Sequence, residues 1–365
     1  MYQLRRTRRA TQTLTHYLAA VTVLGSLFFS ACVADERVVQ AEVTTIPGFR
    51  APEDIDVLMD DGALIVSGYS ATENGDLRIF HPGTGKIELV YVPGEGDLAT
   101  ANTLAWGAST CPGPPPGFAP HGIHVSKNAI GSYTLLAVNH TGRESVEWFE
   151  VRKVDSAYRA VWRGCVIVDE PYWINDVAML PDGGFVASHM MPRDRALEAF
   201  QREPNDGIKS GYVIEWQQGS GWNKVPGTEG ALPNGIQVSS DGAVVYSNHY
   251  LGNGVVAVER ASGKRVWTTA VEGAPDNLSI TSDGRLLAVT HLANIATIGD
   301  CISRPEQVCN VGFRVYWLDA MTGRVQKVLS GGNANFGGAT VAIEVGDSVY
   351  LGSATGEWIG RVPAR

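Results

Sequence analysis

The sequence contains few charged residues and lacks the signatures of several common enzyme classes. Charged residues make up 18% of the chain, and after residue 32 no apolar run is long enough to span a membrane as a helix. No G-x-S-x-G segment occurs, which disfavours a serine hydrolase. A P-loop and the Cys/His spacing of zinc sites are also missing from the sequence. These absences exclude the common nucleotide-binding and zinc-binding motifs.

Residues 1–32 have the composition of a secretory signal. Four arginines begin the segment, an apolar stretch follows from Leu18 to Phe29, and Ser30-Ala31-Cys32 ends it. The ending also resembles a bacterial lipobox, in which lipidated Cys32 would attach the protein to a membrane. Simple cleavage nearby is the alternative. We therefore expect the chain to be exported, either as a periplasmic or outer-membrane-anchored lipoprotein or as a secreted protein.

The charge and cysteine content agree with that expectation. The formal net charge is −9, and loss of the four signal arginines would make it −13, so nucleic acid is not an expected partner. Four cysteines follow Cys32, and in an oxidising compartment they allow two disulfides with three possible pairings. Cys301 and Cys309 are close enough to close a small loop, and Cys111 with Cys165 is the natural remainder. The sequence gives no indication of oligomeric state.

The rest of the chain, residues 33–365, has the pattern of short strands rather than helices. Apolar, β-branched runs such as Ala243-Val244-Val245-Tyr246 recur, and several directly follow an Asp-Gly turn, which is a strong hairpin signal. A second feature, a polar or Gly-containing step into an apolar strand, occurs six times at intervals of roughly 40 to 70 residues. The six steps are Glu53-Asp54-Ile55, His121-Gly122-Ile123, Asn175-Asp176-Val177, Asn234-Gly235-Ile236, Asp276-Asn277-Leu278 and the degenerate Gly338-Ala339-Thr340. Because this interval fits one four-stranded blade, the sequence predicts an all-β, six-bladed β-propeller.

Polar side chains at these steps would converge, because the innermost strand of each blade lines the central channel of a propeller. Their oxygens are hard ligands of the kind that calcium prefers, and two carboxylates with three amides match the charge of one Ca²⁺. The predicted ligands are Glu53, Asn175, Asn234, Asp276 and Asn277. The alternative is that these residues are turn formers or caps.

A second set of oxygens lies one residue further along. Asp54, Asp176 and the backbone carbonyl of Ile123 could hold a second, structural calcium. The alternative is that the two aspartates only accept hydrogen bonds from backbone N–H groups.

Short motifs in a fixed order resemble the paraoxonase family of calcium-dependent lactonases and arylesterases, and more widely the gluconolactonase-like and strictosidine synthase-like propellers. They are Glu53-Asp54, Pro120-His121-Gly122-Ile123, Val138-Asn139-His140, Asn175-Asp176, Asn234-Gly235-Ile236 and Asp276-Asn277. The resemblance implies a catalytic calcium on the first ligand set and a structural calcium on the second. It also implies a histidine dyad of His121 and His140, with His291 near the pocket.

The chain also departs from this family. The carboxylate that orients the second dyad histidine has no clear match, since the aligned segment reads Ser188-His189-Met190-Met191. Leu232 replaces an aromatic residue of the pocket, and the family's long-range disulfide is not evident. We therefore expect a metal site that is intact beside a proton relay that has lost a partner.

The expected function is calcium-dependent hydrolysis of a small lactone or aryl ester, in which calcium polarises the carbonyl that water attacks. His121, with His140 behind it, or Glu53 would serve as the base, and the sequence leaves the choice open. A non-enzymatic, calcium-stabilised propeller that binds a small molecule or a protein is the alternative.

Overall fold

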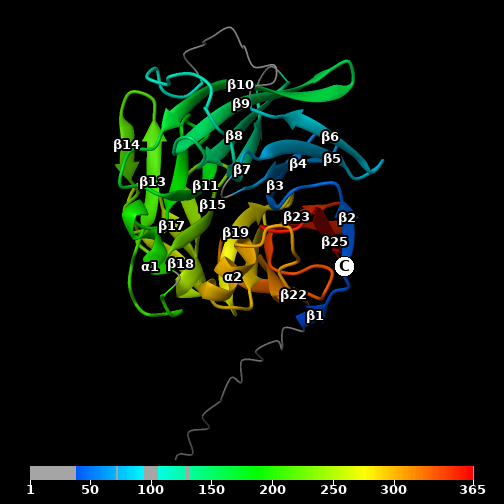
Figure 1. Ribbon diagram of the computed structural model, residues 1–365. Helices are drawn as coiled ribbons and strands as arrows, with labels where there is room; N and C mark the ends of the chain where they lie inside the picture. The colour runs from blue at the N-terminus through cyan, green and yellow to red at the C-terminus, as the bar shows by residue number, and fades with distance from the viewer. Residues whose placement is uncertain (1–37, 71–72, 94–105, 129–130, 200, 365) are drawn as a thin grey trace, which may run out of the picture. The chain divides into compact units, whose positions relative to one another are not determined.

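The computed structural model describes residues 38–364 except 71–72, 94–105, 129–130 and 200. The predicted signal segment, including Cys32, lies outside the described residues. Six small antiparallel sheets surround a common centre (Figure 1), which confirms the six-bladed propeller. No helix in the described ranges is long and apolar enough to cross a membrane.

Each of the first five blades is a run of four consecutive strands. Blade 1 contains β3 (Pro52–Leu58), β4 (Ala63–Gly68), β5 (Asp76–His81) and β6 (Lys86–Tyr91), and blade 2 contains β7 (Pro120–Lys127), β8 (Tyr133–Asn139), β9 (Ser145–Val154) and β10 (Ala157–Ile167). Blade 3 contains β11 (Ile174–Met179), β12 (Phe185–His189), β13 (Tyr212–Gln217) and β14 (Gly221–Lys224), and blade 4 contains β15 (Pro233–Val238), β16 (Val244–His249), β17 (Gly254–Glu259) and β18 (Arg265–Ala270). Blade 5 contains β19 (Ala274–Ile280), β20 (Leu286–His291), β21 (Phe313–Leu318) and β22 (Val325–Gly331).

Blade 6 joins the two ends of the described chain. Its inner three strands are β23 (Ala339–Val345), β24 (Ser348–Ser353) and β25 (Trp358–Pro363), and its outer strand is β2 (Thr44–Pro47), antiparallel to β25. The short strand β1 (Val38–Gln40) runs parallel to β22 at the edge of blade 5. The ring of blades is thus closed by backbone hydrogen bonds between segments more than 300 residues apart in the sequence.

The turns and the cores follow from the repeat. At the Asp241-Gly242 turn, Gly242 adopts φ +69°, and the Asp241 carboxylate accepts a hydrogen bond from Ala243 N at 3.0 Å. Apolar side chains from neighbouring blades pack together; Ile65 of blade 1, for example, shares a fully buried cluster with Leu135 and Phe149 of blade 2. Each such side chain contributes about 1.5–3 kcal/mol relative to exposure.

Every innermost strand carries a bulge close to its start. The register with the neighbouring strand shifts at Pro52/Asp54, Pro120/Ile123, Ile174/Val177, Pro233/Ile236, Pro275/Leu278 and Ala339/Ala342. A bulge bends a strand and re-aims its side chains. The six polar steps of the sequence coincide with these six bulges.

Both expected disulfides are present, Cys111–Cys165 and Cys301–Cys309. The second pair ties together the segment around α2 (Ile295–Ile302), which starts where Asn294 Oδ1 accepts a hydrogen bond from Thr297 N at 2.9 Å. The other helices are short: η1 (Arg193–Arg195), α1 (Ala196–Ala199) and η2 (Tyr250–Gly252).

Candidate metal centre

The predicted calcium ligands all lie at the bulged starts of innermost strands. Glu53 is in β3, Asn175 in β11, Asn234 in β15, and Asp276 and Asn277 in β19. All five are buried, with 1–7% of their surface exposed. The propeller therefore places on one axis five side chains that come from four separate blades.

Glycine lets neighbouring blades approach closely at this level. A Cβ on Gly122 would lie 2.6 Å from Asp176 Cα, and a Cβ on Gly235 would lie 2.5 Å from the backbone oxygen of Asp276. Both glycines therefore bring one blade against the ligand-bearing strand of the next. The sequence motifs contain these two glycines, but their packing role becomes visible only in the fold.

Several ligands touch one another across the axis. Asn277 Nδ2 donates to Glu53 Oε1 at 2.9 Å, although blades 5 and 1 are far apart in sequence. The Asn234 side chain hydrogen-bonds Asp276. Thr340 of blade 6 donates from Oγ1 to the backbone oxygen of Glu53 at 2.5 Å. Blade 6, which has no predicted ligand, thus contributes by holding the position of one.

Four of the five ligands each present a buried oxygen that has no hydrogen-bond partner. These atoms are Glu53 Oε2, Asn175 Oδ1, Asn234 Oδ1 and Asn277 Oδ1. A buried polar atom without a partner costs about 1–3 kcal/mol, and most proteins have few of them. A bound cation would satisfy all four at once.

The carboxylates at this level favour the same interpretation. Burial, then the neighbouring Asp276, raises the pKa of Glu53 well above its usual value. Burial raises the pKa of Asp276 to about 7, and the hydrogen bond from Asn234 opposes that shift. Two buried carboxylates without a counter-charge are unfavourable, and a divalent cation would reverse that balance.

The donor set selects the kind of ion. Within the described ranges, no three His, Cys, Asp or Glu side chains are grouped so as to hold a metal by themselves. The side chains that lie at this level are two carboxylates and three amides, whose oxygens suit calcium and not zinc. The residues present fit calcium.

The second predicted layer is different, because its carboxylate oxygens already have partners. Asp54 accepts hydrogen bonds from Ile55 N at 2.8 Å and from Ile123 N of blade 2 at 2.7 Å. Asp176 accepts from Val177 N at 2.7 Å and from Ile236 N of blade 4 at 2.8 Å. Each aspartate therefore links its own blade to the next one, as the alternative to a structural calcium predicts. An oxygen that accepts one hydrogen bond has a second lone pair, so the second ion stays a prediction.

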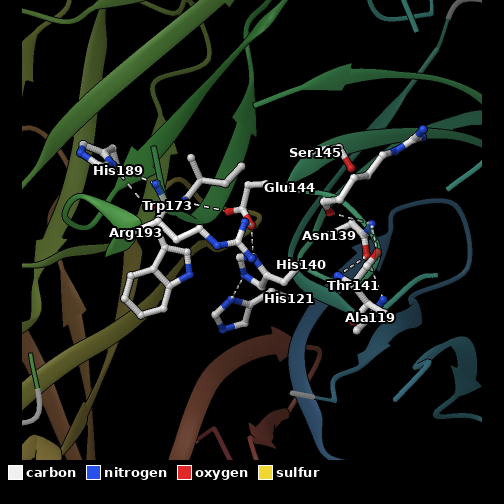
Figure 2. Close-up of polar contacts among 12 residues, drawn as sticks. Ala119, His121, Asn139, His140, Thr141, Glu144, Ser145, Trp173, His189 and Arg193 are labelled. Atoms are coloured by element: carbon white, nitrogen blue, oxygen red, sulfur yellow. Dashed lines mark hydrogen bonds and ion pairs between the residues drawn. The ribbon is translucent and has the colours of Figure 1, made fainter. Parts of the chain in front are cut away.

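The two dyad histidines are in contact: His121 Nδ1 lies 3.0 Å from His140 Nε2 (Figure 2). They lie beside the ring of predicted ligands, since His121 Nε2 is 3.6 Å from Glu53 Oε1. Burial, then the charge of His140, lowers the pKa of His121 well below its usual value. His121 is therefore neutral at pH 7 and can accept a proton.

The expectation that His140 has no orienting carboxylate is wrong. Glu144 Oε2 lies 2.8 Å from His140 Nδ1, as Figure 2 shows. The glutamate follows the histidine by four residues, in the turn between β8 and β9, rather than in the Ser188–Met191 segment of the next blade. The local spacing His140-x-x-x-Glu144 is a signal in the sequence, whereas the family resemblance places the carboxylate on β12 of the next blade.

Two aromatic residues that the sequence did not single out support the histidines. Tyr69 stacks on His121 with ring centroids 4.8 Å apart, and burial with the nearby Glu53 raises the pKa of Tyr69 to about 12. A second such pair lies next to the predicted ligand Asp276: Tyr250 Oη is 3.0 Å from His291 Nδ1, and His291 Nε2 is 3.5 Å from Asp276 Oδ2. His291 thus lies next to a predicted ligand, as the resemblance implies.

Comparison with known proteins supports the fold and leaves the family open. No protein-family model matches the sequence, and no curated protein matches it. Among solved structures, a luciferin-regenerating enzyme is 12% identical, with a TM-score of 0.52 over 89% of this chain and 95% of that one. A candidate gluconolactonase is 14% identical, with a TM-score of 0.50 over 88% of this chain and 92% of that one. The chain therefore shares the propeller fold of these proteins.

Proposed function

We propose that this protein is a calcium-dependent hydrolase that opens lactones or cleaves aryl esters at the ring of Glu53, Asn175, Asn234, Asp276 and Asn277. The observation that carries the proposal is the set of four buried, unpartnered oxygens in that ring. They lie beside a neutral histidine whose free nitrogen faces the ring. The structural similarity to a candidate gluconolactonase supports the choice of lactones.

In the proposed hydrolysis, the residues around the ring have different roles. When bound, calcium would polarise the substrate carbonyl and balance the charge that develops on its oxygen. His121 Nε2 accepts a proton from the attacking water, while His140 holds the other ring nitrogen of His121 in place. Glu53, which is 3.6 Å from the same nitrogen, is the alternative base.

The test is a panel of γ- and δ-lactones and aryl esters, assayed on the purified protein with and without a chelator. The proposal expects turnover that the chelator abolishes and that excess calcium restores, and it expects Asn234→Ala to lower activity strongly. Turnover that survives both chelation and Asn234→Ala would overturn the calcium mechanism. Intact calcium binding without turnover of any substrate would instead support a non-enzymatic binding propeller.

We also propose that the protein is exported and attached to a membrane through lipidated Cys32. Two disulfides are typical of an oxidising compartment. Fractionation of cells that produce the wild type and Cys32→Ser tests the attachment. Release of the variant alone is expected, and a wild type found only in the soluble fraction would contradict it.

A further inference from the structure

Glu144 is a buried acceptor that receives three hydrogen bonds from three different parts of the protein. Its Oε2 accepts from His140 Nδ1 at 2.8 Å and from Arg193 Nη1 at 2.7 Å. Its Oε1 accepts from the backbone N–H of Ile174 at 3.2 Å. Arg193 and the backbone N–H of Ile174 can only donate, so both carboxyl oxygens act as acceptors, and this environment favours the tautomer in which His140 Nδ1 also donates.

This arrangement determines which nitrogen of each histidine carries the proton. Glu144 holds His140 with its Nδ1–H towards the carboxylate, and in a neutral His140 the Nε2 atom then has a lone pair that accepts from His121 Nδ1–H. His121 Nε2 is then left with a free lone pair, and this is the nitrogen that faces Glu53. With the proton of His140 on Nε2 instead, either two N–H groups would face each other or His121 would carry its own proton on Nε2, which removes the lone pair that faces Glu53.

The same carboxylate also connects two other parts of the site. Ile174, whose N–H it accepts, directly precedes the predicted ligand Asn175 in β11. Arg193 belongs to η1, in the long connection between β12 and β13, and 37% of its side-chain surface is exposed. The Glu144 side chain thus contacts the histidine pair, the start of β11 and the segment inserted between β12 and β13.

We propose that Glu144 and Arg193 are a positioning pair, which fixes the tautomer of His140 and thereby presents His121 Nε2 as the base. Arg193 holds Glu144 from the solvent side, and Glu144 acts on the reaction only through the two histidines. The kinetic consequence rests on the proposed function, whereas the tautomer consequence does not.

The chain contains a matched control for a purely structural role. Glu147, three residues further along, is also buried and is paired with Arg143 at 2.8 Å. It accepts from Ser145 Oγ at 2.6 Å and from Trp162 Nε1 at 2.7 Å, and the arginine holds the backbone oxygen of Gly113. This second glutamate–arginine pair has no hydrogen bond to a histidine among the contacts described.

The test compares Glu144→Ala with Glu147→Ala by nitrogen NMR of histidine-labelled, purified protein, alongside thermal unfolding. We expect both variants to lose stability, and only Glu144→Ala to move His140 from the Nδ1–H towards the Nε2–H tautomer. Glu144→Gln, which can turn its one oxygen to the two side-chain donors, should retain the wild-type tautomer. An unchanged His140 tautomer in Glu144→Ala, or an equal change in both alanine variants, would overturn the proposal.

Kinetics provide a second measurement. Glu144→Ala should lower kcat by about 10- to 100-fold, as loss of an orienting carboxylate does elsewhere, with a change in KM of less than about twofold. If Glu144→Ala does not fold, Arg193→Leu serves as the second variant. It should lower kcat by a smaller factor, and Arg193→Lys should restore part of the lost kcat. Arg193→Leu with wild-type kcat would count against the pair. If the wild type hydrolyses no substrate, the proposed function fails, and the tautomer comparison still decides the positioning role.

Discussion

Two layers of oxygen ligands lie one residue apart on the axis of this propeller, and they differ in how far their hydrogen bonds are satisfied. In the ring of predicted catalytic ligands, Glu53 and Asn175 each have a buried oxygen without a partner. In the second predicted layer, Asp54 and Asp176 each accept two backbone hydrogen bonds, one of them from the next blade. All four side chains carry acceptor oxygens and are buried to a similar degree, so the difference lies in which backbone N–H groups are within reach.

The contrast separates the proposed binding site from a layer that links neighbouring blades. Satisfied carboxylates join blades and need no further ligand, because their desolvation is offset by N–H donors. Unsatisfied oxygens lower stability until something binds them. The bulge in each innermost strand allows adjacent residues to serve both purposes, since it turns successive side chains in different directions.

The largest effect should come from removing calcium. We expect a chelator to lower kcat/KM by about 10³-fold, equivalent to about 4 kcal/mol of transition-state stabilisation. Calcium should restore the activity, and magnesium should do so poorly because it dehydrates reluctantly and demands octahedral geometry. The measurement is a chelation and add-back series with a lactone substrate. Equal recovery with magnesium would contradict a calcium site built from amides.

A pair of adjacent alanine variants compares the two layers directly. In calcium-free buffer, Asp176→Ala should lower the free energy of unfolding by about 2–3 kcal/mol, because Val177 N and Ile236 N lose their acceptor. Asn175→Ala should change it by less than about 0.5 kcal/mol, since it removes an oxygen that has no partner. Denaturant unfolding measures both values. Equal losses would show that the layers do not differ in the way proposed.

The dependence of stability on pH should be steeper without the ion than with it. Burial raises the pKa of Asp276 to about 7 from an ordinary value of 3.8. Between these values the folded, calcium-free protein holds a proton that the unfolded chain has lost. Its free energy of unfolding should therefore fall as the pH rises, by at most about 1.4 kcal/mol per pH unit for each such carboxyl.

Calcium should remove this slope, because a cation favours the ionised carboxylate. Asp276→Asn should make the slope shallower in calcium-free buffer. Denaturant unfolding at pH 5, 6 and 7, with chelator and with calcium, provides the comparison. A calcium-free protein that gains stability over this interval would show that the ring carboxylates are ionised without a cation.

The fold and the residues that meet in the ring of predicted ligands could be predicted from the sequence, because both depend on a repeat. Asp-Gly turns and polar steps recur once per blade, so convergence at Glu53 and Asn277 followed from topology alone. The two disulfides were also predictable, since few pairings were available.

The contacts that distinguish the two layers could not be read from the sequence. Whether Asp54 meets Ile123 N depends on a bulge and on the close approach that Gly122 allows between blades. The role of Glu144 was missed for a related reason: its partners Arg193 and Ile174 belong to another blade. Pairwise geometry across blades is set by packing, and local patterns do not report it.

The smallest effect, and the finest comparison, should come from neutralising the adjacent acids Glu53 and Asp54. Glu53→Gln keeps an oxygen for Asn277 Nδ2 and removes a carboxyl group that burial and Asp276 make costly to ionise, so in calcium-free buffer at pH 8 it should stabilise the protein by about 1 kcal/mol. Asp54→Asn turns an NH₂ group towards either Ile55 N or Ile123 N, so under the same conditions it should destabilise by about 1 kcal/mol. Urea unfolding of both variants tests the signs. Opposite changes in the free energy of unfolding would mean that Glu53 serves a ligand and Asp54 serves the fold. If both variants lose stability, Glu53 also serves to stabilise the fold.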